Sequence, residues 1–140
     1  MIYRNEVRIL YSDTDAYGVV WHGAYTKWFE AGRVELSEML GLPLEELEKQ
    51  GVTFPVVEMN VRYKSSAWFN ERIIIETGIE CLKNTSVTFF HKVTEKESGK
   101  VRTLATSTIV AIDKNGKLYR KLPDNIYSCY KKAVLEPEKV

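Results

Sequence analysis

This sequence has few cysteines and almost no net charge. Its only two cysteines, Cys81 and Cys129, lie far apart and form no C-x-x-C pair, so we expect reduced thiols rather than a disulfide or a zinc site. The 20 lysines and arginines nearly balance the 19 aspartates and glutamates, which leaves a formal net charge of +1. Because so small a net charge offers no global field for nucleic acid, we expect no nucleic-acid partner.

Long apolar runs are also missing. Residues 1–6 already include charged side chains and contain no apolar signal-peptide core. No apolar run in the sequence approaches the length that spans a bilayer. We therefore expect a cytoplasmic protein without an integral membrane segment. The 140 residues contain no repeat or linker and predict a single domain, 1–140. A domain of this size can bury about 68% of its unfolded surface without a disulfide or a metal.

The first half of the chain has the pattern of a strand followed by two helices. Loose alternation predicts a strand over residues 3–11. Apolar residues at three- and four-residue steps then predict a long amphipathic helix over about 22–40, with Gly41 just past its end. Residues 43–50 begin with proline and are followed by glycine, which is typical of a short second helix.

The second half is rich in Val, Ile, Thr and Phe and is punctuated by turn residues. These runs predict antiparallel strands over residues 54–63, 72–82, 85–95 and 101–113. The pair Asn115-Gly116 predicts a type I′ hairpin turn that leads into a small strand over 118–120. Residues 123–132 predict a closing helix, and residues 136–139 predict a frayed tail.

This order of elements predicts an α+β fold in which an antiparallel sheet of about five strands wraps around one long central helix. Gly32 lies in the middle of that helix, where glycine costs about 1 kcal/mol relative to alanine, and so predicts close packing of a strand against the helix. One sheet covered by one helix leaves a sheet edge or face free, which predicts a homodimer or a homotetramer, a dimer of dimers.

Residues 11–25 are the most informative segment, because they bring two carboxylates and a glycine to the start of the long helix. The first N–H groups of a helix lack intrahelical acceptors and carry the positive end of its dipole, so they can stabilise a thioester carbonyl oxygen under attack. Asp15 can act there as nucleophile or as general base on a water. Gly18 suits a tight bend before the helix. The alternative is that Asp13 and Asp15 only cap turns.

The same residues begin like a calcium-binding EF-hand loop, with acidic groups at positions 1 and 3 and glycine at position 6. However, Tyr17 occupies position 5, where an oxygen ligand belongs, and Ala24 occupies position 12, where a bidentate Glu belongs. We therefore expect no metal site. Serine-hydrolase, zinc-protease, dinucleotide and P-loop motifs do not occur either.

Residues 11–41 resemble the signature of hot-dog-fold acyl-CoA thioesterases of the 4-hydroxybenzoyl-CoA thioesterase type, including the bacterial branch associated with the Tol-Pal system. The similarity continues more weakly through residues 55–63 and 75–77. The resemblance implies a hot-dog fold and the hydrolysis of an acyl-CoA thioester to a carboxylic acid and CoA, without a cofactor. The family's usual run has Asn at the position of Ala24, and Ala or Gly at that of Tyr17, so the resemblance does not fix the acyl specificity of this chain.

The resemblance also implies roles for individual residues. Asp15 corresponds to the catalytic carboxylate, and the backbone N–H groups of His22 and Gly23 correspond to the oxyanion donors. The side chain of His22 either positions Asp15 or takes no part. Glu30 either lines the acyl pocket or forms an ion pair with Arg33. The remaining expected substrate contacts are Gly18, Val19, Trp21, Tyr25, Asn60, Arg62, Tyr63, Lys64, Lys83 and Ser86, together with residues 58–61 of a neighbouring subunit.

Two other functions remain open at this stage. A hot-dog dehydratase would share the fold, but it is expected to show a pairing of histidine with an acidic residue that this sequence does not reveal. A non-catalytic module would bind acyl-CoA in the same pocket without turnover. Such a regulator usually needs an additional segment that binds DNA or a partner, and a single domain of this length leaves little room for one.

Overall fold

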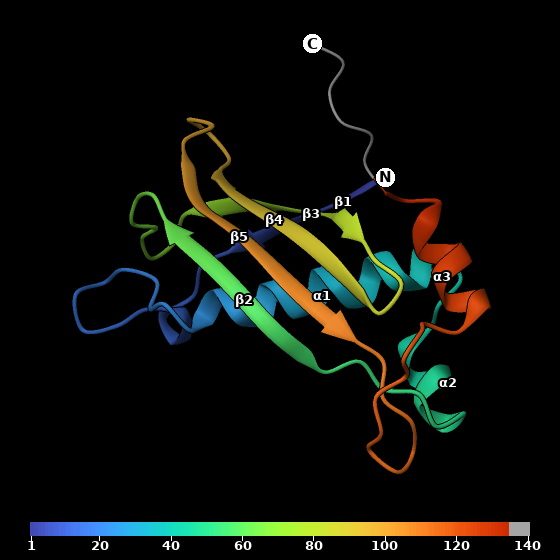
Figure 1. Cartoon of the computed structure of the whole chain (residues 1–140). Helices are drawn as coiled ribbons and strands as arrows, with labels where there is room; N and C mark the ends of the chain where they lie inside the picture. The colour runs from blue at the N-terminus through green and yellow to red at the C-terminus, as the bar shows by residue number, and fades with distance from the viewer. Residues whose placement is uncertain (135–140) are drawn as a thin grey trace.

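A five-stranded antiparallel sheet curves around one long helix in the computed structural model, which describes residues 1–134 (Figure 1). In chain order the elements are β1 (Ile2–Arg8), the 3₁₀ helix η1 (Tyr11–Asp13), α1 (Ala24–Met39), α2 (Leu44–Lys49), β2 (Val56–Tyr63), β3 (Arg72–Leu82), β4 (Ser86–Glu95), β5 (Val101–Val110) and α3 (Asp124–Lys131). The strand order is β1-β3-β4-β5-β2, and every neighbouring pair is antiparallel. The predicted α+β class is confirmed, and the predicted tail at 136–139 lies outside the described residues.

The hairpin after β5 differs from its prediction. The predicted strand 118–120 is wrong, because only Leu118 pairs there, through an isolated bridge to Ile112. The turn is not type I′ either, since Gly116 is its only residue with a positive φ, at 78°. The Asp113 carboxylate accepts the N–H groups two and four residues further along. These bonds favour a type I turn that Gly116 closes, a common three-residue hairpin connection.

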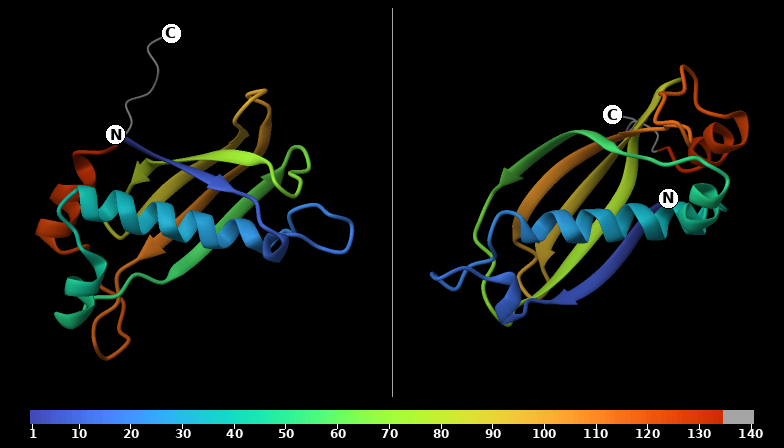
Figure 2. Two further views of the ribbon diagram at one scale, coloured as in Figure 1. Left: turned by 180° about the vertical axis from the view of Figure 1, so that it is seen from behind. Right: turned by 90° about the horizontal axis from the view of Figure 1, so that it is seen from below.

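Helix α1 lies along the concave face of the sheet, as Figure 2 shows from behind and from below. Its apolar side chains form one buried face, made by Tyr25, Trp28, Phe29 and Leu36. Gly32 lies on this face, and a Cβ placed on it would be only 2.1 Å from Oγ1 of Thr77 in β3. The expectation that a strand packs closely against Gly32 is therefore confirmed.

Two apolar clusters fill the space between α1 and the sheet. One contains Leu36, Phe89 and Tyr130 and lies toward α2 and α3. The other contains Ile9 and Ile73 and reaches the segment that leads into α1. Because close-packed interiors resist deformation, this second cluster gives the start of α1 a rigid base.

A polar cluster is buried between α1 and the middle of the sheet. His91 of β4 is 1% exposed, and its Nδ1 and Nε2 lie 3.2 Å from Thr77 Oγ1 and 2.8 Å from Ser107 Oγ. Arg33 donates to the same Ser107 hydroxyl at 3.1 Å, and the ring of Phe29 stacks on the imidazole. Desolvation, helped by the positive charge of Arg33, lowers the pKa of His91 to about 3. The imidazole is therefore neutral at physiological pH.

We expect this buried histidine to make the fold sensitive to acid. The pKa of His91 lies near 3 in the folded chain, against 6.5 for a free side chain. Between these values only the unfolded chain binds the proton, so the free energy of unfolding falls by about 1.4 kcal/mol per pH unit as the pH drops through this window. Above pH 6.5 both the folded and the unfolded chain carry a neutral His91, so this group no longer changes the free energy of unfolding. Urea unfolding of the wild type and of His91→Gln between about pH 7 and 4 measures it, and equal pH slopes for the two proteins would contradict it.

Candidate active site

The segment between β1 and α1 is anchored by a buried carboxylate. Asp13 is 3% exposed, and its two oxygens accept the N–H of Leu10 at 2.9 Å and the ammonium group of Lys27 at 3.1 Å. Lys27 belongs to α1, so this ion pair ties the segment to the helix. Of the two predicted aspartates, Asp13 therefore has the structural role of capping a turn.

Asp15 lies beyond this anchor, at the tip of the loop formed by residues 14–22, which we call the acidic loop. Its side chain is exposed, and Oδ1 accepts the N–H of Tyr17 at 2.8 Å. The Asp15 N–H donates to Val19 O and the Gly18 N–H donates to Asp15 O. Gly18 takes a φ of +81°, as the prediction of a tight bend requires. Within residues 1–134 the second oxygen, Oδ2, accepts no hydrogen bond, so it is free to act on a substrate or a water.

The start of α1 offers unpaired backbone donors. The helix begins at Ala24, two residues later than predicted, and Gly23 is its N-cap residue without a side-chain cap. The Trp21 N–H donates to Asp13 O, but within the described part of the chain the N–H groups of His22 and Gly23 donate to no acceptor. These groups carry the positive end of the helix dipole and can bind an oxyanion.

The indole ring of Trp21 packs directly against the helix start. A Cβ on Gly23 would lie 2.1 Å from Cζ3 of this ring, so a larger residue there would require the indole to move. The ring remains 45% exposed and forms an edge contact with the imidazole of His22, with centroids 5.6 Å apart. Trp21 thus lies against Gly23 at the helix start but does not line the cleft described below, and its acyl-pocket role stays a prediction.

A cleft of about 350 Å³ opens at this end of α1. It is lined by Val20, His22, Tyr25, Tyr63, Lys64, Ser65 and Ser66. The Tyr63 hydroxyl donates to the carbonyl oxygen of His22 at 2.9 Å. Burial raises the pKa of both Tyr25 and Tyr63, so both phenols keep their protons and can donate hydrogen bonds.

The structure thus brings four of the predicted residues to one cleft, namely His22, Tyr25, Tyr63 and Lys64. Sequence reasoning missed Val20 and the two serines as lining residues. Both serines follow the β2 strand that carries Tyr63, and this position was a usable signal.

Asn60 and Arg62 lie apart from this cleft within one chain. Because side chains alternate along a strand, Met59 and Val61 point into the core while their neighbours point to the outer face of the sheet. There Asn60 and Arg62 line a separate groove of about 510 Å³ that also contains Phe90.

Lys83 and Ser86 lie at the opposite end of the sheet. Ser86 pairs with Val110, whereas Tyr63 pairs with Thr103. Seven residues along β5 separate these partners, which corresponds to about 23 Å at the usual rise of a strand. Only another subunit could bring Lys83 and Ser86 to the cleft.

Glu30 is exposed on α1, and among the described residues it forms no ion pair with Arg33. Arg33 turns toward Ser107 instead. Desolvation lowers the pKa of Arg33, and the charge of Glu30 opposes this effect. The predicted ion pair is therefore wrong in this structure, and the acyl-pocket role of Glu30 stays a prediction.

The described residues form neither a metal-ligand cluster nor a membrane-spanning helix. Within residues 1–134, no three or more His, Cys, Asp or Glu side chains gather in a way that could hold a metal ion. No helix in this part of the chain is both long and apolar enough to cross a membrane. The expectation that the protein works without a metal or cofactor stays a prediction.

A curved sheet wrapped around a single long helix defines a hot-dog fold. The acidic loop that leads into the start of this helix gives the fold a hydrolase-like site. Residues 9–138 match the model of the thioesterase-like superfamily. The chain belongs to this family. The family and the enzyme class predicted from residues 11–41 are thereby confirmed, whereas the assignment to the Tol-Pal-associated branch stays a prediction.

Individual relatives agree with this membership. The chain is 30% identical over 133 residues to YneP of Bacillus subtilis, covering 93% of this chain and 96% of that protein. It is 30% identical over 130 residues to the acyl-CoA thioester hydrolase YbgC of Escherichia coli, with the same coverage. Among solved structures, the DHNA-CoA thioesterase of Staphylococcus aureus superimposes with a TM-score of 0.85 at 29% identity, over 94% of this chain and 89% of that one.

Proposed function

We propose that this protein is an acyl-CoA thioesterase that hydrolyses an acyl-CoA to a carboxylic acid and free CoA. The observation that carries this proposal is that the N–H groups of His22 and Gly23, at the positive end of α1, donate to no acceptor among residues 1–134. The acidic loop that carries Asp15 leads directly into them. The YbgC relative, named as an acyl-CoA thioester hydrolase, supports the substrate class.

In the proposed reaction the thioester carbonyl oxygen accepts hydrogen bonds from the N–H groups of His22 and Gly23. Attack on the carbonyl carbon moves negative charge onto this oxygen, and each backbone donor stabilises that charge by about 3 kcal/mol. Asp15 either attacks the carbon itself or removes a proton from the attacking water. The carbon–sulfur bond then breaks, and the CoA thiolate leaves and takes up a proton. If Asp15 acts as base, the attacking water supplies both the hydroxyl of the acid and this proton. If Asp15 attacks, a water then hydrolyses the anhydride between Asp15 and the acyl group, which releases the carboxylic acid and restores the Asp15 carboxylate.

The remaining predicted contacts complete this proposal. Trp21, Tyr25 and Glu30 shape the acyl pocket, and Gly18, Val19, Tyr63 and Lys64 border the channel that leads to it. The other four, Asn60, Arg62, Lys83 and Ser86, would come from a neighbouring subunit. The edge position of β2 supports a homodimer or a dimer of dimers, because Val57 is 58% exposed there and an unpaired edge favours strand addition.

Two further expectations belong to this proposal. The whole chain would act as one thioesterase domain, 1–140, and it would work in the cytoplasm. The two free cysteines, Cys81 and Cys129, suit a reducing compartment.

A thiol-release assay over short, long and aromatic acyl-CoAs tests the proposed function. Free CoA that appears together with a carboxylic acid is the expected result. Formation of an enoyl thioester without thiol would indicate a dehydratase. Tight binding of acyl-CoA with no product from any substrate would indicate a non-catalytic module.

Tyr63→Phe is expected to slow turnover modestly. The substitution removes the hydroxyl that holds the His22 carbonyl, and losing one hydrogen bond of this kind costs about 1 kcal/mol, which is about a fivefold change in kcat if the oxyanion donors shift. Tyr11→Phe is the matched control, since Tyr11 is 75% exposed and its ring stacks on Phe69 without using the hydroxyl. Equal kcat values for the two variants would contradict a role of Tyr63 in holding the helix start.

A further inference from the structure

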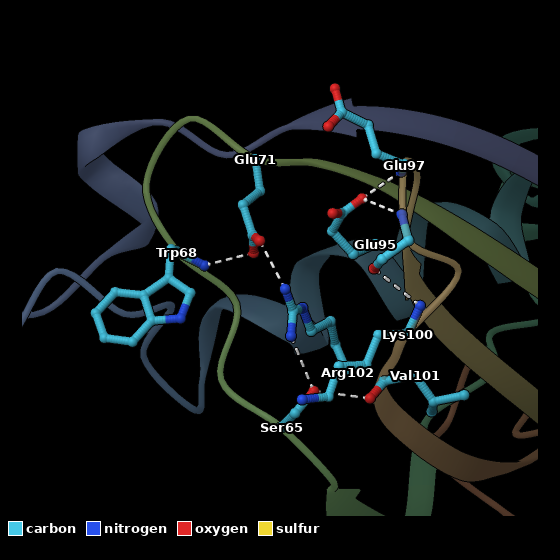
Figure 3. A network of polar contacts seen from close by, with 9 residues as sticks. Ser65, Trp68, Glu71, Glu95, Glu97, Lys100, Val101 and Arg102 are labelled. Carbon is cyan, nitrogen blue, oxygen red and sulfur yellow. Dashed lines mark hydrogen bonds and ion pairs between the residues drawn. The ribbon is translucent and has the colours of Figure 1, made fainter.

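Arg102 of β5 is a buried cation outside the cleft (Figure 3). The residue is 8% exposed. Its guanidinium group donates to Glu71 Oε2 at 2.6 Å and to Ser65 Oγ at 3.1 Å. A buried ion pair adds little net stability, because desolvation offsets the attraction, but it can select one geometry. The proposed reaction uses no charge at this place, so the pair needs another explanation.

Both partners belong to the connection between β2 and β3, residues 64–71, which we call the β2–β3 loop. At its start the Ser65 N–H donates to the carbonyl oxygen of Arg102 at 3.1 Å. At its end the second carboxylate oxygen of Glu71 accepts the N–H of Trp68 at 2.8 Å. Arg102 therefore holds the beginning and the end of this loop against β5.

The middle of the β2–β3 loop holds the acidic loop. The Val20 N–H donates to Ala67 O at 2.8 Å, and the Phe69 N–H donates to Gly18 O at 3.2 Å. The ring of Phe69 stacks on Tyr11 with centroids 3.8 Å apart. Contacts therefore run without a break from Arg102, through the β2–β3 loop, to the loop that carries the proposed catalytic carboxylate.

We propose that Arg102 is a positioning residue for catalysis. Its two-pronged contact with Glu71 and Ser65 fixes the β2–β3 loop, and this loop sets the distance between the Asp15 carboxylate and the start of α1. This inference rests on the proposed function. A displacement of about 1 Å at a reacting group can lower the rate about a hundredfold, whereas binding of the CoA portion does not depend on that distance. The effect should therefore be larger on kcat than on KM, which changes only through the cleft-lining residues of this loop, Lys64, Ser65 and Ser66.

Two changes test this role. Arg102→Lys keeps the positive charge but lacks the planar fork that reaches both partners at once. The double variant Arg102→Met with Glu71→Leu removes both charges and leaves no unpaired ion in the interior, so we expect it to fold. Arg4→Gln is the control. The Arg4 side chain is 69% exposed, and its ion pair with Glu76 does not involve the β2–β3 loop.

Steady-state kinetics and amide hydrogen exchange are measured on each folded protein. We expect kcat to fall about tenfold to a hundredfold in both test variants, with KM within about twofold of the wild type. The Val20 amide should exchange faster, while the amide of Phe89 in the core strand β4 keeps its rate. The control should match the wild type in every measurement.

Wild-type kcat in the folded double variant, or a wild-type exchange rate for Val20, would overturn the inference. If the double variant does not fold, Arg102→Lys decides the matter, and wild-type kcat in that enzyme overturns the inference as well. Failure of the proposed function looks different. In that case the wild type releases no thiol, or Asp15→Asn releases it at the wild-type rate.

Discussion

Asp15→Asn is expected to lower kcat by about 10²–10⁴-fold while the protein stays folded. The substitution keeps the shape of the side chain, and its amide oxygen can still accept the Tyr17 N–H, so the loop should keep its turn. The negative charge that attacks the thioester or activates water is lost. Thiol release measured at saturating substrate gives kcat, and urea unfolding gives the stability of the same preparation.

Asp113→Asn is the matched control for this experiment. Asp113 also holds a turn by accepting the N–H two residues further along, but it lies in the hairpin after β5, away from the cleft. Its replacement removes the same charge from the same kind of turn and should leave kcat unchanged. Comparable turnover in the two variants would remove Asp15 from the mechanism.

Gly32→Ala is expected to destabilise the fold by about 2–3 kcal/mol, although alanine favours a helix by about 1 kcal/mol over glycine. The new methyl group would meet Oγ1 of Thr77 at 2.1 Å and its Cβ at 3.0 Å. Thr77 is completely buried and lies within hydrogen-bond distance of His91, so it cannot turn away without breaking that contact. The midpoint and slope of urea unfolding measure the change.

The neighbouring residue supplies the control. Ala31 is exposed on α1, so Ala31→Gly should cost about 1 kcal/mol through helix propensity alone. Alanine should thus stabilise the protein more than glycine at residue 31, whereas glycine should stabilise it more than alanine at residue 32. A Gly32→Ala variant that is as stable as the wild type, or more stable, would contradict the close approach of α1 to β3.

Local patterns were sufficient for most elements of the fold. The three- and four-residue spacing of apolar side chains predicted α1, because only a helix gathers such residues on one face. Gly32 even predicted which helix must approach a strand. The hairpin at Gly116 was mispredicted because Asn115-Gly116 suggested a type I′ turn, whereas the Asp113 carboxylate, two residues before Asn115, stabilises a type I turn.

The candidate site was only partly visible in the sequence. Asp15 and Gly18 are close to the start of α1 along the chain, so their spacing predicted one site, and the structure places both in the loop that leads into α1 but not among the residues that line the cleft. The roles of Asp13 and Asp15 could not be separated in this way, because burial and the partner Lys27 distinguish them. Arg102 was missed because its partners Ser65 and Glu71 lie 37 and 31 residues away in the sequence, a pairing that only the folded chain shows.

The sequence alone determined the class of fold and the family to which the chain belongs, and it predicted the segment proposed to carry the chemistry. Each of these depends on periodicity and on residues close together in the chain, which a linear pattern records. The tertiary structure decided which aspartate is buried, which side chains line the cleft and how the β2–β3 loop supports the acidic loop. These depend on pairing between strands that are tens of residues apart, and the distances that result are set by packing of the whole sheet against α1.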